Sequence, residues 1–200
     1  PASIQGLYES PAQGIYEGIT IPAINIPGIT YDVARSLFRA ALKNRVGAFV
    51  FEIARSEMSY TRQNPAEYST CILAAAIRER FKGPVFILGD HFQINRNAYI
   101  QDPLKELTAI EELIRESINA GFLNIDIDAS TLVDTSKSDL EEQQENNCLI
   151  TALMTHFIRK NEPKDVTISI GGEIGEIGAG NSTVEELRTF MSGYLNRLLP

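Results

Sequence analysis

The sequence predicts an α/β fold organised around a parallel sheet. Five short segments rich in β-branched residues alternate with five longer segments of helical periodicity, and this alternation is typical of consecutive βα units. Each strand and its helix together occupy roughly 30 to 40 residues, which is the spacing of a supersecondary repeat. Signals for the starts and ends of helices fall at the same divisions.

The predicted strands are short runs that end in polar or small residues. In chain order they are residues 19–27, 47–54, 83–90, 122–129 and 165–173. Asn64, Ser138 and Ser182 each stand three residues before a glutamate, where a side-chain oxygen can cap the start of a helix. Pro65 suits the first turn of its helix, and Gly121 suits a helix end.

The composition limits the possible partners. The chain of 200 residues carries a formal charge of −8 and has no stripe of Lys and Arg, which argues against nucleic-acid binding. The longest apolar run, residues 71–77, is far shorter than the roughly 20 residues of a membrane helix. The N-terminus lacks the pattern of a signal peptide, so we expect a cytoplasmic protein with no membrane partner. Cys71 and Cys148 lack metal-ligand spacing and are expected to be buried, reduced thiols.

Polar residues gather at the predicted strand ends, which is where parallel α/β sheets bind their ligands. They are Asn25, Glu52, Asp90, His91, Asp126, Asp128, Glu173 and Glu176. Four of the five strand ends carry a carboxylate, and carboxylates that share one place repel each other unless a cation or a suitable substrate compensates them. We therefore expect the binding site at this edge of the sheet.

Asp90 and His91 form the most informative pair, because the chain has only two histidines. Imidazole and carboxylate groups are common ligands of zinc and similar divalent ions, and His91 with Glu173 could supply one of each. A plainer interpretation makes Asp90 and His91 a helix cap or a loop contact. The other histidine, His156, lies inside a predicted helix and is expected to be a surface or packed residue.

Four stretches resemble the class II, metal-dependent fructose- and tagatose-bisphosphate aldolases. They are "IPAINIPGITYDVARSLFRAA", "PVFILGDHF", "NIDIDASTL" and "GGEIGEIG". These look like that family's first strand and helix, its Asp-His strand, its fourth-strand motif and its Glu-x-Gly turn. Their order and spacing agree with the family over residues 19–180. The resemblance implies a partial TIM (β/α)8 barrel, with five parallel βα units in sequential order.

The resemblance also implies a chemistry. It makes His91 and Glu173 ligands of Zn²⁺ or another divalent cation, and Asp90 the catalytic acid/base. Asn25 and Asp128 would lie near the substrate, which is a phosphorylated sugar. In that family the metal polarises the ketose carbonyl, and a ketose bisphosphate is cleaved reversibly to dihydroxyacetone phosphate and an aldehyde. We expect such a carbon–carbon lyase of carbohydrate metabolism.

The length bears on this expectation, because a closed barrel takes about 250 residues. Residues 1–200 would then form one domain that is the N-terminal five-eighths of a longer barrel. Open sheet edges invite association, so we also expect a homo-oligomer.

Two alternatives stay open. One is a non-catalytic companion subunit of a tagatose-bisphosphate aldolase. The other is a flavodoxin-like ligand-binding domain, whose strand order would be 2-1-3-4-5 rather than sequential. Residues 170–183 are rich in glycine but match neither GxGxxG nor GxxxxGK[ST], so they are a weak sign of nucleotide binding.

Overall fold

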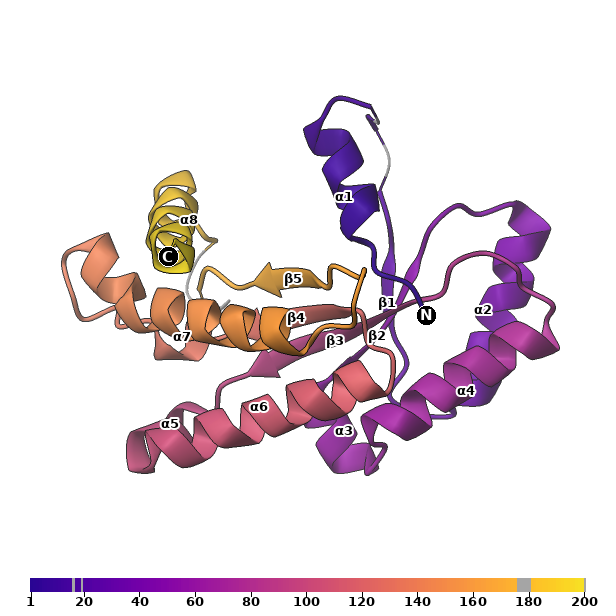
Figure 1. The fold of residues 1–200 in the computed structure, drawn as a ribbon, viewed down its shortest axis with the longest axis horizontal. Helices are drawn as coiled ribbons and strands as arrows, with labels where there is room; N and C mark the ends of the chain where they lie inside the picture. Colours follow the sequence, from indigo (N-terminus) through magenta and orange to yellow (C-terminus); the bar gives the residue numbers. More distant parts are fainter. Residues whose placement is uncertain (16, 19, 176–180, 200) are drawn as a thin grey trace. The chain divides into compact units, whose positions relative to one another are not determined.

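A computed structural model describes residues 1–15, 17, 18, 20–175 and 181–199 (Figure 1). Its five parallel strands form one sheet in the sequential order β1-β2-β3-β4-β5. They are β1 (Ala23–Asn25), β2 (Val50–Ala54), β3 (Phe86–Gln93), β4 (Asn124–Asp128) and β5 (Ser169–Gly172). The predicted α/β class and strand order are confirmed, and this order excludes the flavodoxin-like alternative. Closure of the sheet towards a barrel and a homo-oligomeric state stay predictions.

The five long helices expected from the sequence are present. They are α2 (Thr30–Asn44), α4 (Pro65–Arg78), α6 (Pro103–Asn119), α7 (Leu140–Asn161) and α8 (Val184–Leu198). Four short elements were not predicted, because each is too short to show a helical period. They are α1 (Gln5–Ala12), α3 (Arg55–Thr61), α5 (Arg96–Gln101) and the 3₁₀ turn η1 (Ser130–Leu132).

The helix caps are predicted correctly in kind, and two of the three are displaced by one residue. The Asn64 side chain accepts a hydrogen bond from the Glu67 N–H at 2.9 Å, as expected. Asp139, rather than Ser138, caps α7, because its carboxylate accepts from two backbone N–H groups of the first turn. Thr183, rather than Ser182, caps α8 and forms a capping box with Glu186. In both cases the next residue along offers an equally good cap.

Contacts within the chain divide it into two units. The first comprises Pro1–Asp90, Arg115–Ile125 and Glu162–Ser169. The second comprises His91–Ile114, Asp126–Asn161 and Ile170–Pro200. The division falls between Asp90 and His91, so the two members of the pair belong to different units.

The first unit has an aromatic core. Phe38 of α2 lies against Phe51 of β2 and Phe81, with ring centroids 5.0 and 4.8 Å apart, and α2 packs on α4. Val50 faces the other side of the sheet, since consecutive strand residues alternate, and there it packs with Ile4. Ile4, which precedes α1, therefore covers part of this face of the sheet.

The second unit is built around α7, which packs on α8. Cys148 of α7 is buried. A Cβ added to Gly193 of α8 would come within 2.8 Å of the Cys148 sulfur, so the glycine allows α7 and α8 to approach closely. Burial raises the pKa of the Cys148 thiol. Both cysteines are free thiols; Cys148 is buried, as predicted, and Cys71 is half-buried.

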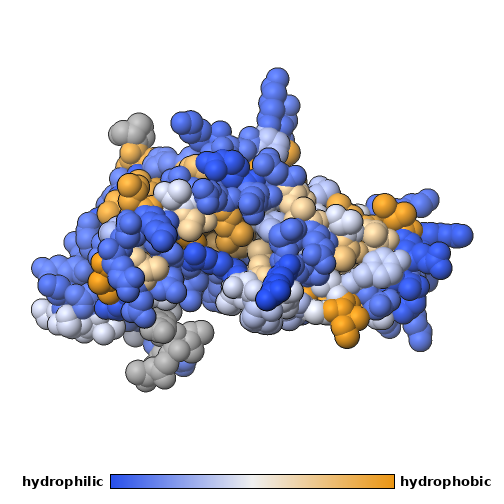
Figure 2. Space-filling model, turned by 90° about the horizontal axis from the view of Figure 1, so that it is seen from below, coloured by the Kyte–Doolittle hydropathy of each residue, from blue (hydrophilic) through white to orange (hydrophobic). Residues whose placement is uncertain are grey.

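The surface is rich in polar residues. The face in Figure 2 is mainly hydrophilic, with apolar side chains scattered across it. Within the described part of the chain, no helix is both long and apolar enough to cross a membrane. Ile19, which begins the first predicted strand, and Glu176 lie outside the described residues.

Candidate functional site

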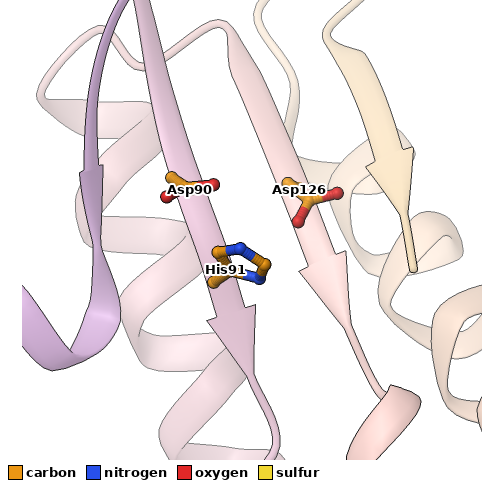
Figure 3. Close-up of side chains that lie close together, drawn as sticks. All are labelled: Asp90, His91 and Asp126. Carbon is orange, nitrogen blue, oxygen red and sulfur yellow. The ribbon is translucent and has the colours of Figure 1, made fainter. Parts of the chain in front are cut away.

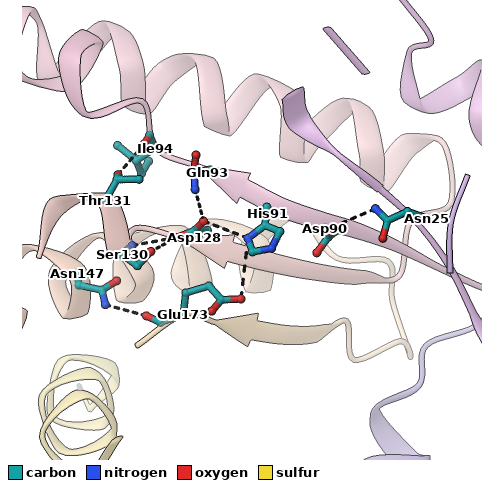
Figure 4. Close-up of polar contacts among 10 residues, drawn as sticks. All are labelled: Asn25, Asp90, His91, Gln93, Ile94, Asp128, Ser130, Thr131, Asn147 and Glu173. Atoms are coloured by element: carbon teal, nitrogen blue, oxygen red, sulfur yellow. Dashed lines mark hydrogen bonds and ion pairs between the residues drawn. The ribbon is translucent and has the colours of Figure 1, made fainter. Parts of the chain in front are cut away.

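In the first unit, the structure brings together two of the predicted site residues. The Asn25 side chain, at the end of β1, donates a hydrogen bond to Asp90 Oδ2 at 3.3 Å (Figure 4). It also donates to Glu57 Oε2 at 3.0 Å. The parallel register explains the approach, because Asn25 pairs with Glu52 on β2, and Ala54, two residues on, pairs with Asp90. Asn25 is exposed and Asp90 is half-buried, so this polar group is open to solvent.

Glu57 is a member of this group that the sequence did not reveal. It lies in the first turn of α3, and its carboxylate also accepts a hydrogen bond from the Ala54 N–H at 2.8 Å. A glutamate at this position usually signals a capping box only when a Ser, Thr, Asp or Asn stands three residues earlier. Here that residue is alanine, so no signal was available.

Glu52 also lies in the first unit, on β2. Its backbone carbonyl accepts a hydrogen bond from the Tyr68 hydroxyl at 2.7 Å. Burial raises the pKa of Tyr68, and the nearby carboxylates of Glu52 and Glu57 raise it further. Tyr68 is fully buried, so this contact ties α4 to the strand beneath it.

In the second unit, three predicted site residues meet around an imidazole. His91 Nδ1 lies 3.1 Å from Asp128 Oδ2 and 3.9 Å from Glu173 Oε1 (Figure 4). The His91 side chain is 48% exposed, whereas that of Asp128 is 2% exposed. A carboxylate can only accept, so this contact favours the tautomer of His91 that carries its proton on Nδ1.

Asp128 is held firmly in this position. Its Oδ1 accepts hydrogen bonds from the Ser130 N–H at 3.0 Å and the Ser130 hydroxyl at 2.6 Å. Its Oδ2 accepts from the Gln93 side chain at 2.6 Å as well as from His91. Both oxygens are thus engaged inside the protein, and this arrangement fixes the orientation of the His91 ring.

The backbone at His91 has an unusual conformation. The predicted strand 83–90 is displaced along the chain, so His91 lies inside β3 rather than in a loop. Its φ is +41°, in the left-handed region where a residue with a Cβ is strained by about 1 to 2 kcal/mol. Strain of this kind persists only where surrounding structure fixes it, and it is common at functional sites.

Asp126 is a further candidate ligand in the second unit. A ring nitrogen of His91 and a carboxylate oxygen of Asp126 lie within 4.8 Å of each other. Figure 3 shows Asp90 and His91 on β3 and Asp126 on β4. On β5, a Cβ on Gly171 would come within 2.5 Å of Asp126 Oδ1, so the absence of a side chain at Gly171 makes room for this carboxylate.

The other histidine takes no part in either group. His156 is exposed on α7, and its Nε2 lies 3.2 Å from the Arg197 carbonyl oxygen. This agrees with the expected surface position.

Comparison with known proteins gives a fold and no family. No protein-family model matches the sequence, and no curated protein matches it either. Among solved structures, the chain is similar to the crystal structure of a probable tagatose 6 phosphate kinase from Sinorhizobium meliloti 1021, with a TM-score of 0.60 and 17% identity. The match covers 90% of this chain and 45% of that chain. The present sequence therefore spans less than half of the neighbour's length, and the likeness at this identity shows the fold alone.

These findings overturn the identification as a class II aldolase. This solved structure, which matches 90% of the chain, is named a probable kinase, and a kinase is a transferase that does not cleave carbon–carbon bonds. The expected lyase activity is therefore wrong, and zinc as the particular metal loses its support. The physical reason is that the motifs used for the resemblance are short stretches at strand ends, and unrelated activities share the same fold and the same strand-end positions.

Proposed function

We propose that the second unit binds a divalent cation through His91, Asp126 and Glu173, and that the protein acts on or binds a phosphorylated sugar. The observation that carries the cation site is the imidazole of His91, half-exposed and oriented by a buried carboxylate. Histidines that ligate metals commonly donate their other N–H to a carboxylate in this way. Asp128 has that role in the proposal.

The ligand set supports the same conclusion. One imidazole nitrogen and two carboxylates are suitable ligands for divalent ions of the first transition series. Sites that leave positions for water or substrate typically have three protein ligands. The cation would also compensate the mutual repulsion of the acidic groups.

A titration with Co²⁺, followed by its absorption spectrum and by calorimetry, tests the cation site. We expect one ion per chain, and an affinity that falls by about 100-fold or more in His91→Ala and Glu173→Ala. His156→Ala is the matched control, because it removes the only other histidine from an exposed position on α7. Wild-type protein that binds no Co²⁺, or equal loss in His156→Ala and His91→Ala, would refute the proposal.

For the first unit, we propose that Asp90 and Asn25 bind a sugar hydroxyl, with Asp90 as the acid/base group. A carboxylate and an amide offer the acceptors and donors that hydroxyls need. The Asn25 hydrogen bond orients the Asp90 carboxylate, which favours a fixed acceptor over a mobile surface charge.

The substrate class comes from the solved neighbour, whose name includes tagatose 6 phosphate. Tagatose 6-phosphate binding, measured by calorimetry, should weaken in Asp90→Asn and in Asn25→Ala. Glu67→Gln, which changes an exposed carboxylate in the first turn of α4, should leave the affinity unchanged. Inorganic phosphate serves as the competitor, and equal affinity for phosphate and for the sugar phosphate would contradict recognition of the sugar.

A further inference from the structure

Two amide side chains are buried on α7 beside the end of β5. Gln144 is 2% exposed and Asn147 is 0% exposed. Neither takes part in the groups described above. A buried amide is destabilising unless its donors and acceptors find partners, so the contacts of these side chains show what they hold in place.

Their donors are directed at two consecutive backbone carbonyls. The Asn147 amide donates to the Glu173 carbonyl at 2.8 Å (Figure 4) and to Gln144 Oε1 at 2.9 Å. The Gln144 amide donates to the Ile174 carbonyl at 2.6 Å. Strand β5 ends at Gly172, so these carbonyls lie just beyond the strand, and α7 fixes the chain where Glu173 begins.

We infer that Asn147, supported by Gln144, is a positioning residue that sets the direction of the Glu173 side chain towards His91. This inference rests on the proposed cation site. A glutamate reaches a ligand through three rotatable bonds, so its carboxylate is placed accurately only when its own backbone is fixed. Binding groups must be held to about 0.5 Å for effective ligation.

The choice of residues favours positioning over simple packing. Other buried positions of α7 are occupied by apolar residues such as Ile150, Met154 and Ile158, which pack without needing hydrogen-bond partners. Amides can instead reach the two carbonyls that follow β5. The hydrogen-bond chain runs from Asn147 to Gln144 and from both to the backbone, which restrains two adjacent peptide units at once.

The test is Co²⁺ affinity in Asn147→Ala, measured on the full chain well below its unfolding midpoint. We expect an affinity about 10- to 100-fold below that of the wild type, the range for loss of a group that orients a metal ligand. The Co²⁺ absorption band should also change, because the carboxylate geometry changes. Gln144→Met keeps the volume and leaves the contact between Asn147 and the Glu173 carbonyl in place, but it loses the Gln144 hydrogen bonds to the Ile174 carbonyl and from Asn147, so it should give a smaller decrease.

Two control variants on α7 separate positioning from stability. Asn161→Ala removes an amide that donates a hydrogen bond within its own helix, to the Phe157 carbonyl. Ile158→Ala removes a buried side chain of α7 about three helical turns from Asn147 and so lowers stability at a distance from the amide pair. Both should bind Co²⁺ within about twofold of the wild type.

The outcomes are distinguishable. If Ile158→Ala weakens binding as much as Asn147→Ala, or if Asn147→Ala and Gln144→Met bind like the wild type, the inference is overturned while the cation site stands. If the wild type itself binds no Co²⁺, the proposed function fails and the inference fails with it.

Discussion

Replacing Asp128 should separate the stability of the second unit from its proposed cation binding. Asp128 accepts four hydrogen bonds, of which the two from Ser130 are buried. The donors of Gln93 and His91 are exposed or half-exposed, so water can replace Asp128 for them. A buried donor without a partner destabilises by about 1 to 3 kcal/mol. Because Asp128→Ala leaves two such donors, it should lower the free energy of unfolding by about 2 to 6 kcal/mol.

Asp128→Asn should behave differently. Its oxygen can still accept both hydrogen bonds from Ser130, so the loss of stability should be only about 1 kcal/mol. Its NH₂ group, however, would face His91 Nδ1 as a donor, which favours the tautomer with the proton on Nε2. Because Nε2 is then unable to ligate, Co²⁺ affinity should fall about 10- to 100-fold.

The chain offers a close control in Asp134. Its carboxylate accepts hydrogen bonds from the Ser136 N–H at 3.1 Å and the Ser136 hydroxyl at 2.6 Å, the same local pattern as Asp128 with Ser130. These bonds lower the pKa of Asp134. Asp134→Asn should leave Co²⁺ affinity unchanged. Urea unfolding measures stability and calorimetry measures affinity, and wild-type affinity in Asp128→Asn would refute the reasoning about the tautomer.

Two further predictions concern packing and pH. Gly171→Ala should lower the free energy of unfolding, measured with urea, by about 1 to 3 kcal/mol, because the added Cβ would come within 2.5 Å of Asp126. Gly28→Ala is the control, since no atom lies within 4 Å of the added Cβ, and its free energy of unfolding should not change. Tyr68→Phe should lower the free energy of unfolding by about 1 kcal/mol at neutral pH, because the Glu52 carbonyl loses the Tyr68 hydroxyl as a donor and keeps only the longer contact with the Ile26 N–H. Burial raises the pKa of Tyr68, so the contribution of Tyr68 to stability is present below about pH 10 and is lost as the pH rises further. Above about pH 10 the stability of Tyr68→Phe should therefore decline less steeply with pH than that of the wild type. Equal declines in the two proteins would contradict this prediction.

The sequence predicted the positions of strands well because their ends coincide with changes from apolar to polar residues. It also placed Asn25 and Asp90 at such ends, and the parallel register then brought them together. Glu57 and Gln93 were missed because the contacts that bring them to the site join residues far apart in the sequence and leave no local pattern. A helix period or a cap is local, whereas a partner 32 residues away is not.

The family assignment was wrong for a different reason. The short motifs around Asp90 and Asp128 describe strand ends of a parallel sheet, and they indicate where a ligand binds. They do not specify which reaction follows, because one fold carries many activities. Residues such as Asn147, which act only through backbone carbonyls, carry no chemical signature in the sequence at all.

The left-handed backbone of His91 leads to a last prediction: at this position the glycine variant should be more stable than the alanine variant, which reverses the usual order of stability. At an ordinary strand position glycine is less stable than alanine by about 0.5 to 1 kcal/mol. At φ of +41°, however, alanine keeps the strain of about 1 to 2 kcal/mol and glycine relieves it. His91→Gly and His91→Ala both remove the imidazole and its contact with Asp128, so their difference isolates the backbone.

We therefore expect His91→Gly to unfold at a higher urea concentration than His91→Ala, although neither binds Co²⁺ like the wild type. Gln93 provides the comparison, because it is an exposed residue of the same strand without a positive φ. There alanine should be the more stable substitution. If alanine were the more stable residue at both positions, the backbone of His91 would not be strained. The protein would then not maintain an unfavourable backbone in order to present this imidazole. If the order reverses only at residue 91, the protein tolerates a less stable strand where the ring must face Asp128 and Glu173, as expected of a binding site.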